Sequence, residues 1–296
     1  MKFTVKWFEV IILIMLCMFL YTNHNFDIIR IKYLYSNFDD THVKTRLFNG
    51  MPIIVNKVDK IVCKSIRETG VWDPVETKAI LPLFKPRQTV VEVGANYGYY
   101  TLLIAEKIGK SGKLISYEAN PDVYKYLIKS VAMNHFRPPM VTVKNLAVAD
   151  HKDTAVLVYG FDNIGGGFIS NIKDEKANCQ NGNGFICHRV ATTSLDEDLG
   201  NIKIDILRMD AEGSEYFILK GAKKILSNSP NAIIIMEWGQ MHFQRVKINI
   251  NDFIELLKEQ KYFIYNIVSP GYLINIGPND LLKVELSNIV LSKQKI

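Results

Sequence analysis

The chain has 296 residues, of which 48% are hydrophobic and 22% charged, a composition that is ordinary for a globular protein with a sizeable core. Its net charge of +6 is spread along the sequence rather than gathered into one block, which argues against a dedicated nucleic-acid-binding surface. The four cysteines form no C-x-x-C pair and no cluster with the spacing of zinc ligands, which argues against a structural zinc site.

The N-terminus carries an apolar run, residues 10–21, preceded by Lys2 and Lys6. The run is short for a membrane span, which needs about 20 residues, but no small-residue cleavage site follows it. We therefore expect an uncleaved signal anchor over residues 1–22, with membrane contact through residues 7–22. Lysines before the run predict a cytoplasmic N-terminus and a lumenal or extracytoplasmic domain. The alternative is that the run forms a buried helix of the domain.

Residues 23–70 are weakly periodic and predict a stem with an N-terminal elaboration, followed by one domain over residues 71–296. Strand and helix patterns alternate through that domain, which is typical of a parallel sheet with crossover helices. They predict a Rossmann-like, doubly wound α/β fold with a mostly parallel, seven-stranded sheet. The expected strands are 89–93, 113–117, one beginning at 141, 204–209, 232–238, 262–268 and 287–291; the expected helices are 75–84, 121–133, one with an apolar stripe at Ile218, Leu219, Ala222, Ile225 and Leu226, and 251–260.

A glycine- and asparagine-rich stretch over residues 160–184 is expected to be a long loop of the kind that contacts substrates. Cys179 and Cys187 bracket part of it. They are expected either to form a disulfide, which requires an oxidising compartment, or to remain free thiols.

The first strand of the domain runs into the sequence Glu92-Val-Gly94-Ala-Asn96-Tyr-Gly98, after which a helix begins. Glycines at the carboxyl end of such a strand let the backbone pass close to a ligand. The spacing is not the G-x-G-x-x-G that cradles a pyrophosphate. A carboxylate before the first glycine would oppose a phosphate and would suit a positively charged ammonium or sulfonium.

Glu118 stands at the end of the second strand, where an acidic residue can accept hydrogen bonds from both hydroxyls of a ribose. Strand, glycine turn, helix, strand and acid together predict a nucleoside pocket without a diphosphate cradle. S-adenosylmethionine fits that description. The structural alternative is a tight turn with a surface glutamate.

Three segments carry a family resemblance: VVEVGANYGYYT, ISYEANP and IDILRMDAEGSEYFILKGAKKIL. They resemble the FkbM family of class I S-adenosylmethionine-dependent methyltransferases over roughly residues 70–292. The resemblance implies the class I methyltransferase fold, with a cofactor site lined by Glu92, Gly94, Asn96, Gly98 and Glu118 and an adenine contact from the backbone of Asn145 to Ala147. Departures are small: Glu92 stands where the family more often has Asp, and Arg208 and Ala211 replace a more usual Lys and Val.

Methyl transfer to a hydroxyl requires a group that takes the proton, and a positioned base typically contributes about 10²–10⁴-fold. The catalytic candidates are Asp210, Glu212 and Glu237, which follow the fourth strand or end the fifth. The alternatives are that Asp210 caps a helix and that Glu212 stabilises its dipole. His242 lies just beyond the fifth strand, and a surface position is favoured for it over a role as the base. Three acids around one crevice could also hold Mg²⁺, but the preferred prediction has no metal.

The resemblance implies O-methylation of a hydroxyl on a sugar, a glycan or another small molecule such as a polyketide. Base-modifying enzymes of this fold carry an Asn/Asp-Pro-Pro-aromatic segment after the fourth strand. This chain has Asp-Ala-Glu-Gly there, which disfavours a nucleic-acid acceptor. One rival is a non-catalytic, membrane-tethered binding protein on the same fold. The other is a nicotinamide-dependent oxidoreductase, against which the glycine spacing speaks.

Overall fold

The computed structural model describes residues 36–170 and 184–296, which belong to one compact unit. The predicted signal anchor, residues 1–22, lies outside the described residues. Within the two described ranges, no helix combines the length and apolarity that crossing a bilayer requires. This finding corrects the prediction of a single-pass membrane protein with a lumenal or extracytoplasmic domain. The apolar run behind that prediction is shorter than the about 20 residues that a span needs.

The central sheet has eight strands, in the order β14-β13-β15-β12-β11-β4-β5-β6. Their bounds are β4 (Thr89–Val93), β5 (Lys113–Tyr117), β6 (Val141–Lys144), β11 (Ile206–Met209), β12 (Ile233–Gly239), β13 (Phe263–Val268), β14 (Tyr272–Ile276) and β15 (Leu286–Ser292). Strands β6, β5, β4, β11 and β12 run parallel, whereas β15, β13 and β14 pair antiparallel. The predicted count of seven was one short, because the short apolar segment YLINI was not recognised as a strand; it forms β14, a largely exposed strand at the edge of the sheet.

Helices cover both faces of the sheet, so the doubly wound arrangement is confirmed. Alternate residues of β4 show this directly, since Val90 packs in one core and Val91 and Val93 in the other. The first core is completed by α3 (Pro74–Ile80), α4 (Tyr99–Ile108) and α5 (Pro121–Met133). The second is completed by α8 (Glu215–Lys220), α9 (Lys223–Asn228) and α11 (Ile250–Glu259).

The helix expected after the fourth strand is two short helices, α8 and α9. They are separated at Gly221, where a side chain would lie 2.3 Å from the carbonyl oxygen of Ala149. This close approach of a neighbouring backbone explains why a glycine stands between the two helices. The apolar stripe itself is confirmed, because Ile218, Leu219, Ala222 and Ile225 are buried in the second core and Leu226 packs against it.

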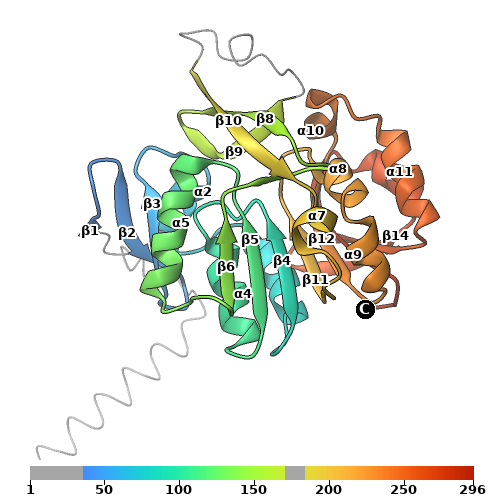
Figure 1. The fold of residues 1–296 in the computed structure, drawn as a ribbon, viewed down its shortest axis with the longest axis horizontal. Coiled ribbons are helices and arrows are strands. Elements are labelled where there is room, and N and C mark those ends of the chain that lie inside the picture. Colours follow the sequence, from blue (N-terminus) through green and yellow to red (C-terminus); the bar gives the residue numbers. More distant parts are fainter. Residues whose placement is uncertain (1–35, 171–183) are drawn as a thin grey trace, which may run out of the picture. The chain divides into compact units, whose positions relative to one another are not determined.

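A second, four-stranded sheet has the order β7-β10-β8-β9 and lies beyond the carboxyl ends of β4, β5 and β6 (Figure 1). It comprises β7 (Ala147–Val148), β8 (Thr154–Gly160), β9 (Asn163–Ser170) and β10 (Phe185–Thr193). The loop predicted over 160–184 is therefore wrong for residues 163–170, whose three consecutive glycines have no strand pattern in the sequence. Cys187 on β10 is disulfide-bonded, while Cys179 lies outside the described residues.

Residues 36–70 form β1 (Ser36–Asn37), β2 (His42–Arg46), β3 (Pro52–Asn56) and α2 (Val62–Thr69), and the three strands pair antiparallel. The buried carboxylate of Asp59 ties this region to the second sheet. It accepts hydrogen bonds from the backbone N–H of Cys63 (2.8 Å) and of Ile164 (3.0 Å) on β9. The region expected as a stem and elaboration thus helps to fix the strand above the central sheet. The remaining elements are η1 (Leu81–Leu83), α7 (Leu195–Leu199), α10 (Gln240–Arg245) and η2 (Pro278–Lys283).

Candidate active site

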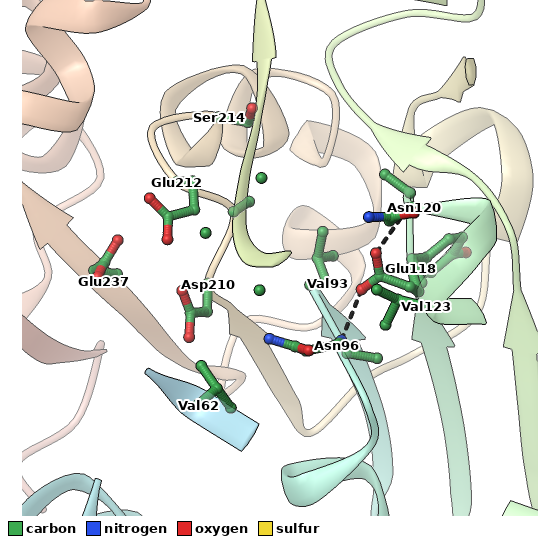
Figure 2. Close-up of a pocket in the computed structure, with 18 of the residues that line it drawn as sticks. Val62, Val93, Asn96, Glu118, Asn120, Val123, Asp210, Glu212, Ser214 and Glu237 are labelled. Carbon is green, nitrogen blue, oxygen red and sulfur yellow. Dashed lines mark hydrogen bonds between the residues drawn. The ribbon is translucent and has the colours of Figure 1, made fainter. Parts of the chain in front are cut away.

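A cavity of about 400 Å³ opens at the carboxyl ends of β4, β5, β11 and β12, covered by residues of β9 and the start of α2 (Figure 2). Such a volume lies in the usual range for small-molecule sites. Of the residues predicted from the sequence, Gly94, Asn96, Glu118, Ala147, Asp210, Glu212 and Glu237 line the cavity, whereas Glu92, Gly98 and Asn145 are not among its lining residues in the described chain.

Gly94 allows the tips of β4 and β11 to meet. Its φ of +78° favours glycine, and a Cβ there would lie 1.9 Å from the carbonyl oxygen of Asp210. The Asp210 N–H donates to the carbonyl of Val93 at 3.0 Å, which holds the two tips together. The glycine therefore brings the Asp210 backbone against the turn that leads into α4.

Asn96, two residues after Gly94 in the turn, is hydrogen-bonded to Glu118 at the end of β5. The backbone N–H of Asn96 donates to Glu118 Oε2 at 2.7 Å, and that of Asn120 donates to Oε1 at 2.7 Å (Figure 2). Asn96 has a φ of +52°, a conformation that asparagine adopts more readily than most residues. Burial raises the pKa of Glu118 to about 7, and the two N–H groups oppose that rise. The carboxylate is thus fixed at the cavity wall.

Glu92 lies below the cavity rather than in its wall. Its Oε2 accepts hydrogen bonds from the hydroxyls of Thr101 (2.6 Å) and Ser116 (2.7 Å), and the side chain is fully buried. Burial raises the pKa of this carboxyl group. Glu92 therefore ties α4 to β5 beneath the glycine turn, so only Glu118 of the two predicted glutamates reaches the cavity.

Gly98 and Asn145 support the site from outside. A Cβ on Gly98, whose φ is +98°, would lie 2.7 Å from Leu127, so this glycine lets α4 begin close against α5. The side-chain amide of Asn145 donates to the carbonyl oxygens of Glu118 (2.8 Å) and Ala119 (3.2 Å). It thereby holds the backbone that carries the Glu118 carboxylate.

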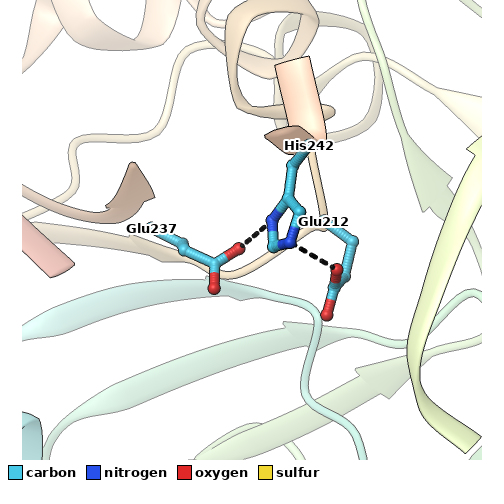
Figure 3. Close-up of side chains that lie close together, drawn as sticks. All are labelled: Glu212, Glu237 and His242. Carbon is cyan, nitrogen blue, oxygen red and sulfur yellow. Dashed lines mark hydrogen bonds and ion pairs between the residues drawn. The ribbon is translucent and has the colours of Figure 1, made fainter. Parts of the chain in front are cut away.

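His242 joins two predicted catalytic acids at the other end of the cavity (Figure 3). Its Nδ1 lies 2.8 Å from Glu237 Oε2, and its Nε2 lies 3.5 Å from Glu212 Oε2. A carboxylate only accepts, so Nδ1 carries a proton directed at Glu237. Burial raises the pKa of Glu237 to about 7, and the hydrogen bond to Glu237 raises the pKa of His242. The protonation of one group therefore affects the pKa of the other.

The loop between β11 and α8 holds Glu212 towards this pair. Glu212 has a φ of +53°, and Arg245 of α10 donates to its carbonyl oxygen (2.8 Å) and to its Oε2 (3.1 Å). The buried Glu215 accepts hydrogen bonds from the N–H groups of Ala211 (2.7 Å) and Gly213 (3.0 Å). Burial raises the pKa of Glu215 to about 8. Glu215 thus acts on the loop rather than on a ligand.

The geometry fits S-adenosylmethionine. Glu118 offers two carboxylate oxygens for ribose hydroxyls, and the Gly94 turn, packed against the Asp210 backbone, lines the same cavity. Ala147, predicted as an adenine contact, lines the same cavity as Glu118. Asp210 lines the centre of the cavity, between Glu118 and Glu237 (Figure 2).

The described residues also contain a group with metal-ligand spacing. One donor atom each from Glu212, Glu237 and His242 lies within 4.8 Å of the others, so these side chains could hold a divalent cation. In the structure both imidazole nitrogens already face carboxylates, an arrangement suited to moving a proton.

The sequence did not single out His242 or Arg245 as functional residues. Both come from α10, a six-residue helix that starts directly after β12. The available signal was the position of His242 five residues after a strand-end glutamate, which lets the short helix turn its side chain back onto Glu237.

Gly94→Ala is expected to lower the free energy of unfolding more than Gly50→Ala. Gly50, in the turn between β2 and β3, also has a positive φ, +88°, but nothing lies within 4 Å of its Cβ position. The control should therefore cost only the conformational penalty, about 1–2 kcal/mol. Gly94→Ala adds the collision with Asp210 and should cost a further 1–3 kcal/mol, approximately. Urea denaturation measures both, and equal losses would contradict the close approach.

Binding of S-adenosylhomocysteine is expected to tighten as the pH rises through about 7, because the ionised Glu118 is the better acceptor for ribose hydroxyls and burial raises its pKa to about 7. Glu118→Gln should weaken binding at pH 8 by about tenfold or more and abolish this contribution to the pH dependence. Glu237→Gln, which removes a group of similar pKa at the other end of the cavity, should keep it. Calorimetry from pH 6 to 8 measures the affinity of each chain for S-adenosylhomocysteine. If Glu118→Gln showed the same pH dependence as the unaltered chain, Glu118 would not contact the ribose.

The family profile described as "Methyltransferase FkbM domain" matches residues 92–264 of the chain. No curated protein matches the chain.

Solved structures with a similar fold include TYW2 of P. horikoshii in complex with MeSAdo, at 16% identity over 86% of this chain and 73% of that chain, with a TM-score of 0.43. Methyltransferase FkbM of Methylobacillus flagellatus is 14% identical over 71% of this chain and 44% of its own, with a TM-score of 0.45. A SAM-dependent O-methyltransferase of Thermotoga maritima is 11% identical over 86% and 94%, with a TM-score of 0.41.

The profile match covers more than half of the chain and includes the glycine turn, Glu118 and the Asp210 loop. The fold is that of an α/β methyltransferase with a large mixed sheet, and the cofactor is S-adenosylmethionine. The chain belongs to the FkbM family of methyltransferases.

Proposed function

We propose that the chain transfers the methyl group of S-adenosylmethionine to a hydroxyl of a sugar, a glycan or another small molecule. The observation that supports this proposal is the His242–Glu237 pair, which lines the same cavity as Glu118 but at its opposite end. A nucleoside held at Glu118 leaves the region around Asp210, Glu212 and Glu237 for the acceptor.

The cofactor supplies an electrophilic methyl group on a sulfonium, and the chain aligns the acceptor with it. Orientation alone can contribute about 7–11 kcal/mol when the reacting atoms are held in line. Glu118 would hold the ribose, Ala147 would contact the adenine, and the Gly94 turn with Asn96 would support the methionine part. Asp210 borders both the cofactor and the acceptor.

The hydroxyl proton passes towards His242 while the new O–C bond forms and the methyl–sulfur bond breaks, with neutral S-adenosylhomocysteine as the leaving group. Glu237 binds the Nδ1–H of the imidazole, which keeps Nε2 available on the side of Glu212. When Nε2 takes the proton, the resulting imidazolium lies between two carboxylates that stabilise its charge. Asp210 and Glu212 accept hydrogen bonds from the acceptor, a role that suits neutral compounds with several hydroxyl groups.

Strand β9 contributes Asn163, Ile164 and the following glycines to the cavity wall, so this segment of the predicted loop helps to select the acceptor. Arg245 borders the same region. Because it binds Glu212, it leaves that carboxylate oriented rather than free to swing.

Transfer of a labelled methyl group to a panel of sugars, glycans, lipids and polyketides tests the proposal. The expected product is a methyl ether on a hydroxyl-bearing acceptor, located by mass spectrometry. Binding of S-adenosylmethionine with no transfer to any member would favour the binding-protein alternative. Methylation at nitrogen or carbon would contradict the proposed acceptor chemistry.

His242→Gln is expected to slow methyl transfer by about 10²–10⁴-fold while leaving the affinity for S-adenosylhomocysteine unchanged. In the unaltered chain the rate should rise with pH and reach half its plateau above pH 6.5, because Glu237 raises the pKa of His242 from 6.5. Glu237→Gln should move this midpoint to lower pH. The control is His151→Gln, whose side chain is 66% exposed and outside the cavity wall. An unshifted midpoint in Glu237→Gln would contradict the pairing.

A further inference from the structure

Arg208 is an almost fully buried arginine that borders the cavity. Only 2% of it is exposed, and it lies on β11 two residues before Asp210. In the sheet it pairs with Glu92 on β4, directly below the Gly94 turn. The sequence marked this position only as a departure from a more usual lysine. A buried guanidinium at a cavity wall needs acceptors for its N–H groups.

The hydrogen bonds of Arg208 are incomplete. Its Nη2 lies 3.3 and 3.4 Å from the two oxygens of Glu76 and 3.3 Å from Asp210 Oδ2. Nη1 donates to no residue of the described chain, and Nε is buried without a partner there. Native proteins satisfy nearly all buried polar groups. Within the described chain, Nε and Nη1 of the guanidinium therefore lack hydrogen-bond acceptors.

The surroundings of Arg208 hold it in place for a ligand. Glu76 of α3 is buried and, unlike Arg208, is not among the residues that line the cavity. It also accepts a hydrogen bond from the hydroxyl of Tyr100 at 2.7 Å, and the Tyr100 ring stacks on the guanidinium at 3.8 Å. Glu76 and Tyr100 thus orient the guanidinium from behind. The N-terminus of α4 beside it adds partial positive charge.

We propose that Arg208 binds the α-carboxylate of S-adenosylmethionine. With the ribose at Glu118 and the turn at Gly94 beneath the sulfur, the amino-acid part of the cofactor extends towards β11. Its carboxylate is the one anionic group that the cofactor carries. The other arginine among the described lining residues, Arg245, is bonded to Glu212 at the acceptor end. Arg208 therefore serves the cofactor rather than the acceptor.

The test compares two ligands that differ only in the carboxylate: S-adenosylhomocysteine and its decarboxylated counterpart, S-adenosyl-3-thiopropylamine. Both have an uncharged sulfur, so the difference in their affinities for the full chain, measured by calorimetry, reports the contribution of the carboxylate. The unaltered chain should bind the decarboxylated compound about 10- to 100-fold more weakly, as expected for charge-assisted hydrogen bonds. In Arg208→Gln this ratio should fall towards one. Arg208→Lys, which keeps the charge but loses the planar fork, should give an intermediate ratio.

The matched control is Arg245→Gln, which should keep the ratio of the unaltered chain. Equal binding of the two ligands by the unaltered chain would overturn the proposal, and this arm needs no folded variant. The proposal would also be overturned if Arg208→Gln kept the affinity ratio of the unaltered chain. Cooperative unfolding on heating would confirm that this variant is folded. If Arg208 instead served an anionic acceptor, its substitution would change only the KM for that acceptor. Because only cofactor binding is measured, the outcome does not depend on whether a hydroxyl acceptor is found.

Discussion

The contact between the tips of β4 and β11 is the constraint on which the site depends. The Asp210 backbone passes so close to Gly94 that a side chain there would meet its carbonyl oxygen at 1.9 Å. Because the two strands meet in this way, the turn that positions Asn96 and the loop that carries Glu212 border one cavity rather than two. The proposed cofactor contacts and the proposed proton transfer both need that single cavity.

Buried carboxyl groups divide into two kinds around the cavity. Oε2 of Glu92 accepts two hydroxyl hydrogen bonds and both oxygens of Glu215 accept backbone N–H groups, so these two residues fix the turn and the loop from behind. Glu118 and Glu237 face the cavity, where burial raises the pKa of each to about 7. A positively charged cofactor is well matched to such a site, since it favours the ionised form of the carboxyls near it.

Strands 89–93 and 113–117 and helix 121–133 could be predicted to the residue, because apolar runs and a Pro-Asp start mark their limits. Strand β9 could not, since its three glycines lack the alternation that reveals a strand. The sequence correctly placed Glu92 in the first strand of the domain. It could not show that the side chain is buried below the cavity, because that depends on hydrogen bonds from Thr101 and Ser116 in the folded chain. His242 was missed because its contact with Glu237 requires α10 to fold back on β12.

The hydrogen bond between Asp59 and β9 determines which fragments of the chain can keep the cavity intact. The family profile begins at residue 92, yet the cover of the cavity is fastened by Asp59 and by the Lys60 N–H, which donates to the carbonyl of Asp162 at 2.8 Å. Val62 then lies against β9, next to Gly165. A fragment trimmed to the segment that the profile matches would lose one wall of the cavity, so a fragment with the complete cavity extends well upstream of residue 92.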